Sequence, residues 1–475
     1  MGDSMNKKII IIVGIIILVV GILLSVLRLN GNRIVKSNIE VDYPIISDES
    51  LTYEKRIFDT NYMHLVNIII ADKDWEDLIK NPLNKTKYNV DVEIDGIRFN
   101  NVSFKTKGNS SLNNIANGPR EGPASNRYSF KINFGKYNKN QTYFGLDKLH
   151  LNNIYGDATY LNDYMSYETF RNIGISAPLD SFVVLKINSE DLGIYLAVED
   201  VGESFFKRND LKGNLYKPEQ EKGNDLGASL TYKDDILSSY SNIFNNAETT
   251  VTEEDKLRLI ESLKKLNNNE VLNTVDVDEV IRYFVAHNYL LSYDSYTGPS
   301  IHNYYLKEEN GLLSIIPWDY NLAFGRFAME EDTTFIANFG IDSPLYKATI
   351  DERPLWKWIV VNEEYRNTYH EVMSELITNY FESGEFNSTV DKTYELIRPY
   401  IKQDSSAFYN INQVDEAVDT LKDFCTYRTK SIRLQLSGEL AADTKEQSMD
   451  DKVDASRINL EKMGLIAKDD KKQMQ

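Results

Sequence analysis

Alternating apolar and polar residues predict that the first half of the chain is rich in β-strands. Residues 90–94 alternate Val and Ile with acidic residues, and the Asp95-Gly96 pair that follows is typical of a tight turn between antiparallel strands. Residues 128–134 alternate in the same way, which places Lys131 on the face opposite the core. Further strands are expected at 97–99, 102–107, 181–187 and 193–198, with one helix at 161–172.

Helical periodicity dominates after Lys217. Thr252 with Asp255, and Asp276 with Glu279, have the three-residue spacing of helix N-terminal caps. Helices are expected to run from these caps to about 266 and 291, and near 363–380, 388–401 and 414–436; a strand hairpin at 302–318 interrupts the series. The last forty or so residues mix charges without apolar periodicity, which predicts a solvated or partly helical tail.

The N-terminus carries a predicted membrane-spanning helix. Residues 9–27 are uncharged and almost all Ile, Val and Leu. A helix of that length rises about 28 Å, against a bilayer core of about 30 Å. No small-residue cleavage site follows it, so we expect an uncleaved signal anchor in the cell membrane, with the large C-terminal part outside the cytoplasm. Basic residues lie on both sides of the segment, so the positive-inside rule leaves the opposite orientation open.

The order of elements predicts an α+β fold with two lobes, in which a cleft between the lobes is the expected ligand site. The predicted units are an anchor at 1–29, a tether at 30–58, a β-rich N-lobe at 59–217, an α-rich C-lobe at 218–437 with its chemical segment at 288–325, and a charged tail at 438–475.

Composition excludes several classes of function. The 53 Lys and Arg residues against 72 Asp and Glu residues make a net charge of −19, and no dense basic run offsets it, so nucleic-acid binding is not expected. A single cysteine, Cys425, excludes internal disulfides and iron–sulfur clusters. No Walker A motif, dinucleotide-binding glycine motif or GxSxG elbow is present.

Candidate chemistry concentrates around the predicted hairpin. Asp294 lies just after a helix, Asn303 opens the first hairpin strand, and Asp319 closes the second, so the last two are expected at the same open end of the hairpin, with Asn303 opposite a residue near 316. Carboxylate and amide oxygens suit Mg²⁺ held together with nucleotide phosphates. The alternative is structural: Asp294 caps a turn, Asn303 ends a strand and Asp319 solvates a loop.

Six motifs in order resemble those of the CotH family, the spore-coat-protein-H kinases. They are FKTKGNSS, RYSFKINF, YFGLDKLHLNN, GDATYLNDYMSYETFRNIGISAPLDSFVVLKINSEDLGIYLAVEDV, GNLYKPE and IPWDYNLAFG, within residues 60–435. The resemblance implies an atypical protein-kinase-like fold that binds ATP with Mg²⁺ or Mn²⁺. It also implies phosphorylation of Ser or Thr in secreted, cell-surface or spore-coat proteins.

The resemblance also implies roles for individual residues. Asp294 takes the place of the catalytic base, and Asn303 and Asp319 take the metal places. Lys131 is expected on the α- and β-phosphates with Glu168 as its ion-pair partner, an assignment that follows the order of the elements. Three more residues lie at motif positions that are expected to line the nucleotide cleft: Lys107, Glu199 and Lys217.

Two positions depart from the family pattern. Asn162 stands where members often carry Arg, which removes a phosphate or structural contact, and Asn321 stands where another acid is frequent, which weakens a second metal contact. Neither departure reaches the three central residues. Beside the kinase hypothesis stands an alternative from another class, a catalytically inactive surface or coat-assembly protein that uses the same fold for binding.

Overall fold

A computed structural model describes residues 39–43, 48, 50–118, 126–220, 225 and 227–464 of the chain. The predicted membrane-spanning segment, residues 9–27, lies outside the described residues and stays a prediction. Among the helices that are described, none has both the length and the apolar character needed to cross a membrane.

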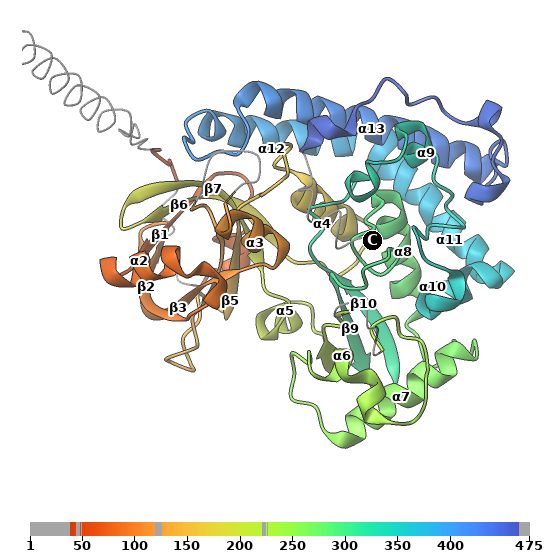
Figure 1. The fold of residues 1–475 in the computed structure, drawn as a ribbon, viewed down its shortest axis with the longest axis horizontal. Coiled ribbons are helices and arrows are strands. Elements are labelled where there is room, and N and C mark those ends of the chain that lie inside the picture. The colour runs from red at the N-terminus through yellow and green to blue at the C-terminus, as the bar shows by residue number, and fades with distance from the viewer. Residues whose placement is uncertain are drawn as a thin grey trace, which may run out of the picture.

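Seven strands of the first half form a closed barrel in the order β1-β2-β3-β4-β5-β7-β6, which confirms the predicted β-rich half (Figure 1). All neighbours are antiparallel except β1 and β6. The predicted turn joins β2 to β3 at Asp95-Gly96, where both residues have positive φ. The strands are β1 (His64–Ile69), β2 (Tyr88–Ile94), β3 (Ile97–Lys107), β4 (Ser129–Asn133), β5 (Lys148–Asn152), β6 (Asp180–Ile187) and β7 (Glu190–Glu199).

The outer face of the barrel differs from one side to the other. Apolar side chains of β6 and β7 point outward and join the core of the helical half, as Val184 and Leu196 do, while their neighbours Val183 and Tyr195 fill the barrel. On β4 the buried Phe130 and Ile132 point inward. Because side chains alternate along a strand, the polar and basic residues between them on β3, β4 and β5 face outward.

Helices and a small sheet, β10-β9-β8, make up the second half, as the periodicity predicts. Its strands are β8 (Asn214–Tyr216), β9 (Tyr304–Glu309) and β10 (Leu312–Pro317). Its helices are α6 (Ser241–Phe244), α7 (Glu253–Asn267), α8 (Val277–Leu290), α9 (Thr333–Ala337), α10 (Pro354–Val361), α11 (Glu363–Leu376), α12 (Glu385–Ile401) and α13 (Ile411–Ser437). Thr252 and Asp255 form the predicted capping box of α7, and the Asp276 side chain caps α8.

Helix α4 (Asn162–Asn172) connects the two halves: it lies between the barrel and α8 (Figure 1). It packs against both β6 and α8, and the rings of Phe170 and Tyr283 are 5.3 Å apart between centroids. Residues on nearly all sides of this helix are buried, so polar side chains on it are held inside the molecule. Three short helices of the first half were not predicted: α2 (Asp72–Lys80), α3 (Ser110–Ala116) and α5 (Glu203–Arg208).

The tail was predicted to be solvated or partly helical, and its described part, residues 438–464, contains three 3-10 helices but packs against the body. Leu440, Leu460 and Met463 are buried, and the Ala158 N–H donates to the Met463 carbonyl at 3.0 Å. The Asn338 side chain is hydrogen-bonded to both backbone groups of Val453. The apolar residues of this segment follow turns and 3-10 helices, so they show no regular spacing in the sequence.

Candidate functional site

A cluster of cations surrounds one buried acid on the outer face of β4 and β5. Asp200, which is 3 % exposed, contacts Lys131 Nζ at 2.5 Å, His150 Nε2 at 2.5 Å and Lys148 Nζ at 3.1 Å. Burial alone would raise the pKa of Asp200, but the His150 hydrogen bond and the two ammonium groups outweigh it and hold that pKa well below its usual range. Burial, together with Lys107 and Lys131, holds the pKa of His150 well below its usual range, so His150 is neutral and donates to an ionised Asp200.

Lys107, at the end of β3, points into the same region from the neighbouring strand. Its Nζ donates to Asn152 Oδ1 at 2.5 Å and lies 5.6 Å from the ring centroid of Trp318. Burial lowers the pKa of Lys107 to about 8, and the carboxylates of Asp319 and Asp163 oppose that shift. The charges of both acids therefore act on the Lys107 ammonium group and favour its protonated form.

The β9–β10 hairpin delivers Asn303 and Asp319 to one end, as predicted, but in a different register. The turn lies at Asn310-Gly311, and Tyr304 pairs with Pro317, so Asn303 lies beside Trp318 rather than opposite 316. Asn303 and Asp319 each have a φ of 57°. Left-handed backbone is unusual for residues other than glycine and gathers at functional sites, although Asn and Asp tolerate it best.

Asp294 contacts the predicted metal residue Asn303 directly. The Asn303 amide donates to the Asp294 carbonyl at 2.9 Å and to its Oδ2 at 3.1 Å, and His302 Nε2 contacts Asp294 Oδ1 at 2.9 Å. Burial opposes protonation of His302, but Asp294, aided by Asp319, raises its pKa above the usual value. The Asp294 carboxylate therefore favours the protonated form of His302.

Asp319 lies between these groups. Its backbone N–H donates to the Tyr167 hydroxyl of α4 at 3.0 Å, while its carboxylate has no hydrogen bond or ion pair among the described residues. Its charge acts on Lys107, Asp163 and His302. Asp294, Asn303 and Asp319 thus share one neighbourhood, although no three Asp, Glu, His or Cys side chains of the described ranges gather closely enough to hold a metal by themselves.

Sequence reasoning missed Asp163, in the first turn of α4. The residue is 7 % exposed. Within the described part of the chain, its Oδ1 has no hydrogen-bond partner and its Oδ2 accepts only a 3.4 Å bond from Asn152. Burial, and after it the Asp319 carboxylate, raises the pKa of Asp163 well above its usual value. A signal was present, because Asp163 stands in a run of aromatic and apolar residues on a helix where an exposed acid is not expected.

Two predictions for the cofactor-binding residues are wrong. Lys131 pairs with Asp200 and not with Glu168, whose carboxylate instead contacts Arg171 at 2.6 Å. Glu199 does not line a cleft: it is fully buried and bound by Tyr53 at 2.6 Å and Arg208 at 2.7 Å. Glu168 was chosen from the order of the elements and Glu199 from its position in a motif. Because side chains alternate along the chain at the end of β7, Glu199 points toward Tyr53, whereas the next residue, Asp200, points toward Lys131.

Lys217 and the two departures from the family pattern, Asn162 and Asn321, lie near the β9–β10 hairpin. Lys217 contacts Glu219 at 3.0 Å and lies 5.9 Å from the ring centroid of Tyr305. The two departures from the family pattern are neighbours, since the Asn162 amide donates to the Asn321 carbonyl at 3.1 Å. The two departures therefore lie together beside the hairpin, and neither residue takes part in the hydrogen bonds between Asp294 and Asn303.

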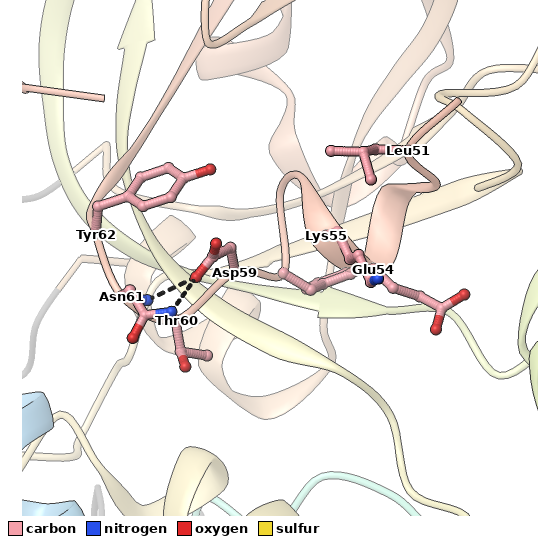
Figure 2. A pocket seen from close by; sticks show the side chains of 8 residues that line it. Leu51, Glu54, Lys55, Asp59, Thr60, Asn61 and Tyr62 are labelled. Atoms are coloured by element: carbon pink, nitrogen blue, oxygen red, sulfur yellow. Dashed lines mark hydrogen bonds between the residues drawn. The ribbon is translucent and has the colours of Figure 1, made fainter. Parts of the chain in front are cut away.

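A surface cavity of about 590 Å³ lies elsewhere, beside the segment that leads into β1. Figure 2 shows its lining side chains, which belong to residues 51–62 and include none of the candidate site residues. Both acids that line it are hydrogen-bonded nearby: Asp59 accepts from the backbone and side chain of Asn61 at 3.0 and 2.6 Å, and Glu54 accepts from the Thr52 hydroxyl at 3.4 Å. This cavity is therefore separate from the candidate site residues.

Comparison with known proteins agrees with the motifs. The family model described as "CotH kinase protein" matches residues 104–432, more than half of the chain. The "Inner spore coat protein H" of Bacillus subtilis (strain 168) is 26 % identical over 311 residues, which cover 62 % of this chain and 80 % of that protein. The matched region contains every candidate residue named above, from Lys107 to Asp319.

Proposed function

Because the chain belongs to the CotH kinase protein family, we propose that it is a protein kinase that transfers the γ-phosphate of ATP, with Mg²⁺ or Mn²⁺, to Ser or Thr. The observation that carries the proposal is the opposition of charges across the site. Lysines 107 and 131 lie on the barrel, and the Asp319 carboxylate, which has no partner among the described residues, lies on the hairpin. A metal–nucleotide complex presents both phosphates for the lysines and a cation for the carboxylate.

Each residue has a distinct part in this proposal. Lys107 and Lys131 bind the phosphates, with Lys131 oriented by Asp200. Asp294 orients the attacking hydroxyl and accepts its proton as the oxygen–phosphorus bond forms and the bond to the β-phosphate oxygen breaks. His302 and Asn303 hold the Asp294 carboxylate in place.

The donor set fits a divalent cation. Asp319 offers a carboxylate that accepts no hydrogen bond from the described residues, and the Asn303 amide oxygen lies at the same hairpin end. Asp319 and Asn303 would hold the ion, which, when bound, neutralises charge on the phosphates. Hard oxygen donors of this kind suit Mg²⁺ and Mn²⁺ rather than softer metals.

The test is phosphate transfer by the purified full-length chain. Incubated with γ-labelled ATP, Mg²⁺ or Mn²⁺ and Ser-rich secreted proteins, the chain should label itself or an acceptor. Asp319→Ala should lose both Mg-ATP binding and transfer, whereas Asp294→Ala should keep binding and lose at least about a hundredfold in turnover. Normal turnover by Asp319→Ala would show that the assignment is wrong.

We infer the acceptors and the location from the family and the N-terminus. The relative's name describes a spore coat protein. Acceptors are therefore proposed among secreted, cell-surface and spore-coat proteins. The anchor predicted at residues 9–27 would hold the enzyme at the cell membrane with the site outside the cytoplasm.

A second candidate function is assembly of a coat or surface layer without phosphate transfer. One observation favours it: both Asp294 oxygens already accept contacts, from His302 and Asn303. A titration of thermal stability with Mg-ATP separates the two candidates. A nucleotide binder gains stability as the ligand concentration rises above Kd, and an inert binding protein does not.

A further inference from the structure

Asp163 is a buried acid whose carboxylate oxygens are not fully hydrogen-bonded by the described residues. Among the described residues its Oδ1 has no hydrogen-bond partner, and its Oδ2 has one long contact, from Asn152 at 3.4 Å. Buried carboxylates in proteins are normally ion-paired, fully hydrogen-bonded or bound to metal. No lysine or arginine of the described chain forms an ion pair with Asp163, so the first two arrangements do not apply.

The surrounding contacts place Asp163 next to Asp319. Tyr167 follows Asp163 by one helical turn, so both side chains leave the same face of α4. The Tyr167 hydroxyl accepts the backbone N–H of Asp319 at 3.0 Å. On the other side, Asn152 links Asp163 to Lys107, whose ammonium group lies beside the ring of Trp318, the residue before Asp319.

We propose that Asp163 is a second carboxylate ligand, together with Asp319, for the divalent cation of this site. Mg²⁺ and Mn²⁺ are commonly held by one or two carboxylates plus phosphate oxygens and water. A cation between the two acids would satisfy the Asp163 oxygen that the protein leaves without a partner. The inference rests on the proposed metal–nucleotide binding, but it does not depend on phosphate transfer.

The proposal predicts opposite effects of Asp163→Asn on stability and on metal binding. Without metal, the neutral amide removes a buried unpaired charge, so the full chain should melt several degrees higher than the wild type. With Mn²⁺, the variant should bind at least about tenfold more weakly, measured from the electron paramagnetic resonance of free Mn²⁺ with and without a non-hydrolysable ATP analogue. A purely structural acid would lower stability when replaced.

Asp278→Asn is the matched control, because Asp278 also lies in the first turn of a helix, α8, but is exposed. It should leave Mn²⁺ affinity unchanged. Asp163→Glu, which keeps the carboxylate, should recover part of the affinity. Wild-type Mn²⁺ affinity in Asp163→Asn, or a control variant that loses as much, would overturn the inference.

The outcomes also separate this inference from the kinase proposal. If the wild type binds Mn²⁺ through Asp163 but labels no acceptor and not itself, the inference holds and the kinase proposal fails. If the wild type transfers phosphate and Asp163→Asn binds Mn²⁺ as tightly, the kinase proposal holds and the inference fails. Absence of Mn²⁺ binding by the wild type with the nucleotide analogue present would overturn both.

Discussion

The acids on the two sides of the site are held in opposite ways. On the barrel side, Asp200 contacts three basic side chains, and Asp404, which reaches the barrel from the loop after α12, contacts Arg127 at 2.5 Å. On the hairpin side, Asp163 and Asp319 form no ion pair within the described chain. The paired acids neutralise neighbouring basic side chains, whereas the two acids without an ion pair are the ones proposed to bind the cation.

The largest effect is expected from Asp404→Asn. Both partners of the Arg127 pair are 1 % exposed, so the change leaves a buried guanidinium group without its counter-charge. We expect a loss of about 3–5 kcal/mol in the free energy of unfolding, measured by urea titration. A loss below about 1 kcal/mol would contradict the view that this pair joins the loop to the barrel.

The pH dependence of stability distinguishes Asp404 from Asp163. Burial opposes ionisation of Asp404, but Arg127 outweighs it and lowers the pKa below the unfolded value. The stabilisation by Asp404 is therefore complete above pH about 4 and is lost as the pH falls through the folded pKa. The pKa of Asp163 is raised, so its destabilisation grows as the pH rises above about 4. The free energy of unfolding, measured by urea titration at a series of pH values, should lose the acid-side decrease in Asp404→Asn and the decrease above pH about 4 in Asp163→Asn.

Asp200→Asn should have the next largest effect. It leaves Lys131 and Lys148 without their shared carboxylate, but both lysines are about a quarter exposed, so water screens part of the penalty. We expect a loss of about 2–4 kcal/mol in the free energy of unfolding, accompanied by weaker nucleotide binding in calorimetry. Unchanged nucleotide affinity in the folded variant would show that Asp200 does not orient Lys131 for binding.

A smaller effect is expected from deprotonation of Lys107. Because burial lowers its pKa to about 8, the positive charge disappears as the pH rises through that value. Nucleotide affinity should therefore fall about tenfold between pH about 7 and about 9, measured by calorimetry. Lys107→Arg, which stays charged over this range, should lack most of that dependence. The same fall in Lys107→Arg would assign the titration to another group.

The smallest effect is expected from Glu168→Gln. Its partner is Arg171, and both side chains are partly exposed, at 31 % and 21 %. The change should cost less than about 1 kcal/mol of stability and leave nucleotide affinity within about twofold. A large loss of affinity would restore the Lys131–Glu168 pair that the sequence suggested, and would show that the site rearranges when nucleotide binds.

Much of the site followed from local rules. Alternation around Lys131 placed its side chain outside the barrel, and the hairpin brought Asn303 and Asp319 to one end even though the expected register was wrong. The register error arose from the position of the turn, Asn310-Gly311, one residue later than the centre assumed. The six motifs identified the family, which the family model then confirmed.

Ion-pair partners could not be read in the same way, because they depend on which strands lie side by side. Asp200 reaches Lys131 and His150 only because β7 pairs with β5 and β5 with β4, which joins residues fifty to seventy positions apart. The burial of Asp163 also depends on tertiary structure, because α4 packs against both halves of the molecule.

The sequence by itself determined most of the elements, the family and the placement of Asn303 and Asp319 at one end of the hairpin, since periodicity, turn residues and motif order are local properties of the chain. Only the tertiary structure decided which charges are neutralised. It paired Asp200 and Glu199 with basic residues, folded residues 438–464 back onto the body, and left Asp163 and Asp319 without an ion-pair partner among the described residues. The physical reason is that the free energy of a charge depends on burial and on neighbours within a few ångströms, and those neighbours come from distant parts of the chain.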